Sequence, residues 1–157
     1  MRLALAEARL AEEAGEVPIG AVVVCNGEVI ARAHNTRETD HNPAGHAEFS
    51  SLLAAAKALD AWRLSDCTVY VTLEPCIMCA GLMHQARIAR CVYGAADPKA
   101  GALGSLYEIH RDTRLNHTFA VEAGVLEDEC ASILKAFFAA KRAQNKQKKK
   151  EICSCIT

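Results

Sequence analysis

The chain has 157 residues, of which 51% are hydrophobic and 24% are charged, and its formal net charge is −1. This length suffices for one domain with a substantial core, and no apolar stretch approaches the ~20 residues of a membrane span. The near-neutral charge conceals an asymmetry, because residues 141–157 hold six basic residues and one acidic residue. We therefore expect a soluble protein with no membrane association, made of one domain over residues 1–145 and a basic, flexible tail over residues 146–157.

Helical and strand patterns alternate along this domain. The predicted strands are β-branched or alternating runs over residues 19–25, 28–35, 67–73, 89–95 and 118–125. The predicted helices cover residues 1–14, residues 46–59, a segment that starts near Pro75, and residues 126–145. The dipeptide Asn26-Gly27 joins the first two strands and is typical of a two-residue hairpin turn. Such alternation indicates an α/β protein, with one sheet and helices on both of its faces.

The N-terminal segment and the eight cysteines argue for a cytoplasmic protein. The first 16 residues alternate charge with Leu and Ala, which is the pattern of a helix and not of a signal peptide. A domain of this size does not need disulfides for stability. Cys25, Cys67 and Cys91 lie in or beside β-type runs, where a buried thiol acts as a small hydrophobic group.

Cys76 and Cys79 stand apart, because they form a C-x-x-C directly after Pro75 in the stretch LEPCIMCAG. A helix that begins here places both sulfurs on one face, next to free backbone N–H groups that favour thiolates. This spacing alone fits a redox pair, half of a structural zinc site, or part of a catalytic metal site.

A third candidate ligand lies thirty residues upstream, in the stretch GHAEF. His46, Cys76 and Cys79 would give a metal three protein ligands and leave its fourth position to water, as in catalytic zinc sites. A closed structural site needs two further ligands, and no second C-x-x-C supplies them. The combination of H-x-E with a downstream P-C-x-x-C is the signature of zinc-dependent deaminases, in which Glu48 would carry protons.

Over nearly all of residues 1–142 the chain resembles the bacterial tRNA-specific adenosine deaminases. The motifs that carry the resemblance are EVPIGAVVV, AHN, HAE, WRL, LEPCIMCAG, RIARCVYGAADPKAGALGS, LNH and AFFAAKR. The resemblance implies a three-layer αβα cytidine-deaminase-like fold with a mixed five-stranded sheet, a homodimer, and one Zn²⁺ per subunit. It also implies hydrolysis of adenosine to inosine at the wobble position (34) of an arginine tRNA, by zinc-activated hydroxide attacking adenine C6.

The same resemblance assigns the contacts with the tRNA anticodon stem-loop. Asn35 is expected to bind the target nucleoside, and Asp97 and Lys99 are expected to contact the RNA backbone. A stretch of the last helix is expected to lie along the anticodon loop, through aromatic stacking and basic groups. Its residues are Phe137, Phe138, Lys141 and Arg142.

The chain departs from the family pattern at several positions around these motifs, namely Phe49, Ser50, Ser51, Gln85, Ala86 and Thr118. Two other functions are compatible with the zinc motifs. One is deamination of a free purine or pyrimidine, for which a small closed pocket would suffice. The other is zinc or RNA binding without catalysis, although such a protein has no use for a free carboxylate at Glu48.

Overall fold

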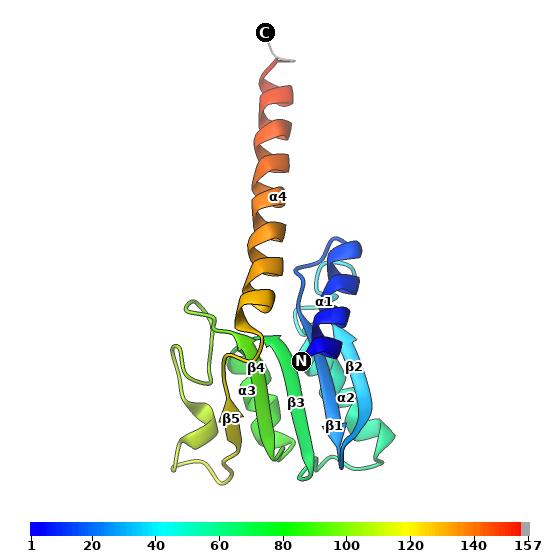
Figure 1. Cartoon of the computed structure of the whole chain (residues 1–157), viewed down its shortest axis with the longest axis vertical. Coiled ribbons are helices and arrows are strands. Elements are labelled where there is room, and N and C mark those ends of the chain that lie inside the picture. The colour runs from blue at the N-terminus through cyan, green and yellow to red at the C-terminus, as the bar shows by residue number, and fades with distance from the viewer. Residues whose placement is uncertain (155–157) are drawn as a thin grey trace.

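The structure is a computed structural model, and it describes the backbone of residues 1–154 and the side chains of residues 1–148. A five-stranded mixed sheet forms its centre (Figure 1), with the strand order β2-β1-β3-β4-β5. The strands are β1 (Gly20–Cys25), β2 (Glu28–His34), β3 (Cys67–Leu73), β4 (Arg90–Ala95) and β5 (Ala120–Glu122). β1 runs antiparallel to β2 and β3, whereas β3, β4 and β5 are parallel. The five strands and the mixed sheet are as predicted.

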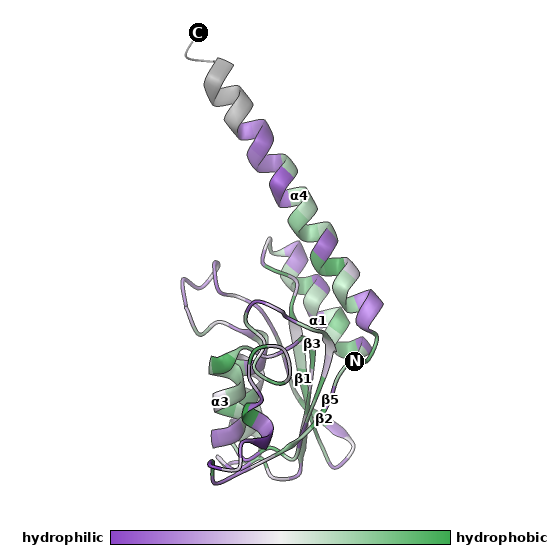
Figure 2. Cartoon of the chain, turned by 90° about the vertical axis from the view of Figure 1, so that its left-hand side faces the viewer, coloured by the Kyte–Doolittle hydropathy of each residue, from purple (hydrophilic) through white to green (hydrophobic). Residues whose placement is uncertain are grey.

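Helices cover both faces of the sheet. They are α1 (Arg2–Glu13), α2 (Ala47–Ala58), α3 (Ile77–Gln85) and α4 (Glu127–Ser154), together with the 3-10 turn η1 (Ile109–Arg111). α2 and α3 pack on one face, over the larger core cluster, while α1 and α4 pack on the other (Figures 1 and 2). This arrangement confirms the three-layer αβα fold.

The hairpin of β1 and β2 follows from its turn residues. Asn26 and Gly27 both have positive φ, at 49° and 83°, as a tight hairpin turn requires. β1 then pairs on both edges, with β2 and with β3. Its valines Val22 and Val23 are almost fully buried because helices cover both faces of the sheet.

α4 is longer than the sequence pattern indicates. It was expected to end near residue 145 but continues to Ser154, because the Gln and Lys residues of this segment are good helix formers. From Phe138 onward its described side chains are exposed, and this part extends away from the sheet (Figure 1) with a hydrophilic outer portion (Figure 2). Among the described residues, no helix has the length and apolar character needed to cross a bilayer. Residues 155–157 lie outside the described part, and the flexibility of the tail stays a prediction.

Candidate active site

Two helix N-termini meet on the same face of the sheet and bring the three predicted ligands together. Cys76 occupies the N-cap position of α3, and Cys79 lies in the first turn of that helix. His46 occupies the N-cap position of α2 with an extended backbone, φ −86° and ψ 145°. Because His46 lies outside the helical turn, its side chain and that of Glu48 can reach one site although they are only two residues apart.

The distances within this group fit a tetrahedral zinc ion. Zinc binds sulfur at about 2.3 Å and nitrogen at about 2.0–2.1 Å, so tetrahedral angles require an N to S separation of about 3.6 Å. His46 Nδ1 lies 3.6 Å from Cys76 Sγ and 3.6 Å from Cys79 Sγ. All three ligand atoms lie within 4.8 Å of one another, and no other such group of His, Cys, Asp or Glu occurs among the described residues. The residues present therefore fit the metal that the motif implies.

The hydrogen bonds among these groups favour a thiolate at Cys76. The hydrogen bond from Cys79, assisted by one with His46, lowers the pKa of Cys76 to about 4 despite burial. The same Cys76–Cys79 hydrogen bond, together with burial, raises the pKa of Cys79. The contact with Cys76 raises the pKa of His46. Cys76 thus favours the thiolate, which is the form of cysteine that binds a metal.

Glu48 lies in the first turn of α2 and is only 4% exposed. Burial raises its pKa to about 7, which suits a group that must both take up and release a proton at neutral pH. Beside it is a small pocket, of about 180 Å³. The residues that line this pocket are Val17, Ile19, Asn35, Arg37, His46, Ala47 and Glu48. The structure thus brings together Asn35, Glu48 and His46, one of the three candidate metal ligands, around one cavity.

Two buried glutamates that the sequence reasoning missed hold loops around this site. Glu16 is 1% exposed and accepts hydrogen bonds from Asn35 Nδ2 at 3.0 Å and from the backbone N–H of Thr39 at 2.6 Å. Glu74 is 2% exposed and accepts from the backbone N–H groups of Asp97, at 3.0 Å, and Leu103, at 3.1 Å. Both lie inside the motifs EVPIGAVVV and LEPCIMCAG, which is the only signal that could have singled them out.

Glu74 organises the loop that was expected to contact RNA. It also accepts from the N–H and the hydroxyl of Ser105, and these bonds lower its pKa although burial alone would raise it. The Ala102 N–H donates to Pro75 O at 2.9 Å, which ties this loop to the cysteine segment. Lys99 is exposed on the loop, and its N–H donates to Asp97 Oδ1. Asp97 and Lys99 are therefore held in one loop beside the ligand segment.

The residues predicted on α4 do not line the pocket. Phe137 is buried at 8% exposure, whereas Phe138 is 44% exposed and meets Phe137 edge to face, with ring centroids 5.5 Å apart. Lys141 Nζ lies 5.4 Å from the centroid of the Phe137 ring. α4 packs against β3 and β4 on the sheet face opposite α2 and α3. Phe137 therefore acts chiefly as a core residue.

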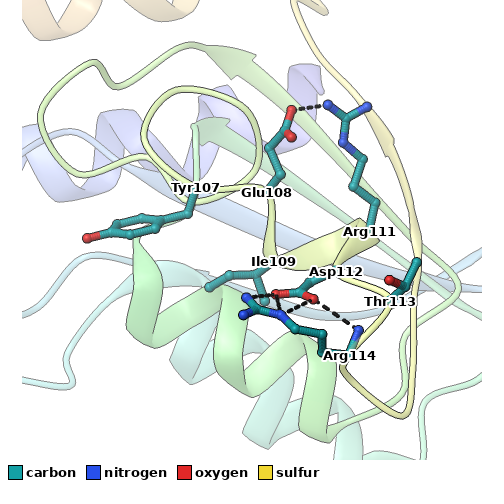
Figure 3. A pocket seen from close by; sticks show the side chains of 7 residues that line it. All are labelled: Tyr107, Glu108, Ile109, Arg111, Asp112, Thr113 and Arg114. Atoms are coloured by element: carbon teal, nitrogen blue, oxygen red, sulfur yellow. Dashed lines mark hydrogen bonds and ion pairs between the residues drawn. The ribbon is translucent and has the colours of Figure 1, made fainter.

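A separate surface hollow is lined by residues of the segment 107–114 (Figure 3). Its two arginines are paired locally, Arg111 with Glu108 and Arg114 with Asp112. The hydrogen bond with Arg114 lowers the pKa of Asp112 to about 2. Because both arginines are paired and none of the predicted site residues lines this hollow, it is not the catalytic pocket.

The αβα fold and a His–Cys–Cys group beside a buried carboxyl group define the class of this protein: it is a hydrolytic deaminase. Residues 1–142 match the family described as MafB19-like deaminase. Among its relatives, the tRNA-specific adenosine deaminase of Bacillus subtilis (strain 168) is 51% identical over 152 residues, covering 97% of this chain and 94% of that protein. The chain therefore belongs to the family of tRNA-specific adenosine deaminases.

A second relative and a solved structure agree with this assignment, and another solved structure, of a guanine deaminase, shares the fold. The tRNA-specific adenosine deaminase of Haemophilus influenzae is 43% identical over 150 residues, or 95% of this chain and 87% of that protein. A structure from studies of A-to-I editing at the wobble position of transfer RNA has a TM-score of 0.82 and 46% identity, covering 85% of this chain and 97% of the other. The guanine deaminase of Nitrosomonas europaea has a TM-score of 0.72 and 25% identity, covering 87% and 81%.

Proposed function

We propose that this protein hydrolyses adenosine to inosine at the wobble position (34) of a tRNA anticodon, with one Zn²⁺ per subunit. The observation that supports the chemistry is the grouping of His46 with Cys76 and Cys79, together with the pocket that His46 and the buried Glu48 line. The choice of tRNA as substrate is supported by the names of the relatives that match nearly the whole chain.

In this proposal each residue of the site has one task. His46, Cys76 and Cys79 hold the zinc ion, which when bound supplies a nucleophile from water at neutral pH. Glu48 takes one proton from the water and delivers it to N1 of the adenine ring as the remaining hydroxide adds to C6. It then takes the proton of the new C6 hydroxyl and delivers it to the departing amine, so that the C6–N bond breaks, C6=O forms and ammonia leaves. Its burial excludes bulk water, which keeps the proton on this path.

The RNA contacts are part of the same proposal. Asn35 binds the target nucleoside in the pocket, and the loop that carries Asp97 and Lys99 contacts the backbone beside it. On α4, the exposed ring of Phe138 suits stacking on an unpaired base, and Lys141 and Arg142 suit the phosphates. The buried ring of Phe137 packs edge to face against the ring of Phe138.

We also propose that the protein is a cytoplasmic homodimer. An apolar hollow on the α2 and α3 side of the molecule supports the dimer, because Leu53 is 49% and Trp62 is 61% exposed there. The residues that line it are Leu52, Leu53, Ala56, Trp62, Leu64, Leu82, Gln85 and Ala86. Exposed apolar surface of this kind marks contacts between proteins, and a second copy of the chain is the partner expected from the family. Light scattering of the wild type and of Trp62→Glu tests the dimer.

The proposed reaction is tested by incubating the zinc-loaded protein with an anticodon stem-loop and measuring inosine at position 34 by mass spectrometry. The wild type should form inosine, whereas Glu48→Gln should form none while retaining zinc. Free guanine and cytidine are assayed in parallel, since activity on these alone would favour a free-base or free-nucleoside deaminase. Absence of inosine with zinc-loaded wild type would contradict the tRNA reaction.

A further inference from the structure

The orientation of the Asn35 side-chain amide is determined by its contact with Glu16. Asn35 follows β2 directly, is 5% exposed and lines the pocket with His46 and Glu48. Its Nδ2 donates to Glu16 Oε2 at 3.0 Å. Among the described residues no group donates a hydrogen bond to its Oδ1. This oxygen is also not among the side-chain atoms that are shut off from solvent without a hydrogen-bond partner, so it is accessible. Asn35 therefore offers the pocket a hydrogen-bond acceptor.

Glu16 prevents this amide from turning over. Its other oxygen, Oε1, accepts from the Thr39 N–H at 2.6 Å and the Thr39 hydroxyl at 2.8 Å, so the carboxylate is anchored on both sides. A carboxylate only accepts hydrogen bonds, and the side chain of Asn35 has a donor only at Nδ2. Turning the amide over would set Oδ1 of Asn35 against Oε2 of Glu16 and lose a charge-assisted hydrogen bond.

An internal adenosine in RNA offers few donors to such an acceptor. The ring nitrogens of adenine accept, the 6-amino group is the one being replaced, and the 3′ and 5′ oxygens are esterified. The ribose 2′-hydroxyl is the remaining donor, and it is the group by which proteins distinguish RNA from DNA. We propose that Glu16 is a positioning residue that directs Asn35 Oδ1 to the 2′-hydroxyl of the target adenosine, so that the site selects ribose over deoxyribose. The inference rests on the proposed function.

The test compares kcat/KM on an anticodon stem-loop with that on the same RNA carrying 2′-deoxy or 2′-fluoro adenosine at the target position only. The wild type should prefer the ribose substrate by about tenfold, the size of one hydrogen bond in a buried site. In Glu16→Gln an amide NH₂ can face Asn35 and allow its amide to turn over, so the preference should fall below about threefold. Asn35→Ala should abolish it. Thr39→Val is the matched control, since it removes one contact of the same carboxylate without freeing Asn35, and it should retain the preference.

The outcomes separate this inference from the proposed function. If the wild type is active but treats ribose and deoxyribose alike, the inference is overturned while the deaminase reaction stands. A preference that stays at the wild-type value in a folded, zinc-loaded Glu16→Gln overturns the positioning role. The wild-type substrate series and Asn35→Ala decide the 2′-hydroxyl contact even if Glu16→Gln does not fold. If the wild type makes no inosine from any substrate, both proposals fail.

Discussion

The Glu74 carboxylate accepts four hydrogen bonds from the loop that carries Asp97 and Lys99, so Glu74→Gln should destabilise the protein. In the variant, Oε1 can still accept from the N–H groups of Leu103, 3.1 Å away, and Ser105, 2.9 Å away. The new NH₂ group then faces the N–H of Asp97, where a donor meets a donor. Hydrogen bonds to charged groups are worth about 1.5–3 kcal/mol, and here one is lost while the others become neutral. We expect a loss of about 2–3 kcal/mol in the free energy of unfolding.

Urea and thermal unfolding at one fixed protein concentration measure this loss, which corresponds to a Tm lower by about 4–12 °C for a chain of this size. Glu13→Gln, on the exposed face of α1, is the control for removal of a negative charge. Gly101→Ala should act in the same direction, because an added Cβ would lie 2.3 Å from Cδ of Glu74. If Glu74→Gln unfolds within about 0.5 kcal/mol of the wild type, the reasoning about the loop is wrong.

Three further results are expected. Cys76→Ser should lose most of the bound zinc by metal analysis, whereas Glu48→Gln should retain about one ion per chain; equal zinc content would refute the ligand assignment. Deletion of residues 146–157 should leave the Tm unchanged, since the described side chains from Phe138 onward are exposed, but it should weaken RNA binding and flatten its salt dependence. An unchanged salt slope would exclude a role for this segment in binding. Burial, with help from Arg87 and His117, lowers the pKa of His84, so the folded state resists its protonation. Stability should therefore fall as the pH drops below about 6.5, and His84→Leu should lose less stability between pH 7 and pH 5 than the wild type. Equal losses in urea unfolding would show that His84 does not contribute to the acid sensitivity.

The group of His46, Cys76 and Cys79 shows what local sequence patterns can predict. Pro75 predicted a helix start at the cysteine pair, and the thiols do lie at the N-terminus of α3. The H-x-E spacing placed His46 and Glu48 at another helix start, where the extended backbone of the N-cap residue lets both side chains reach one site. These features depend on neighbouring residues, so they could be predicted from the sequence alone.

The end of α4 could not be predicted in the same way. The predicted helix ended near residue 145, but α4 continues to Ser154, and its side chains from Phe138 to Lys148 are exposed, so no packing pattern marks its end. The sequence of a helix also does not show against which face of the sheet the helix will pack. For that reason the burial of Phe137, next to the exposed Phe138, was established only by the structure.

The His–Cys–Cys group, the nearby carboxyl group of Glu48 and the order of strands and helices along the chain could be predicted from the sequence, because each depends on short-range spacing and periodicity. The contacts of Glu16 and Glu74 could not, because they depend on the tertiary structure. Their partners lie 19 residues away, at Asn35, and 29 residues away, at Leu103. A buried carboxylate is stable only where donors from distant segments meet it, and only the folded chain brings these donors together.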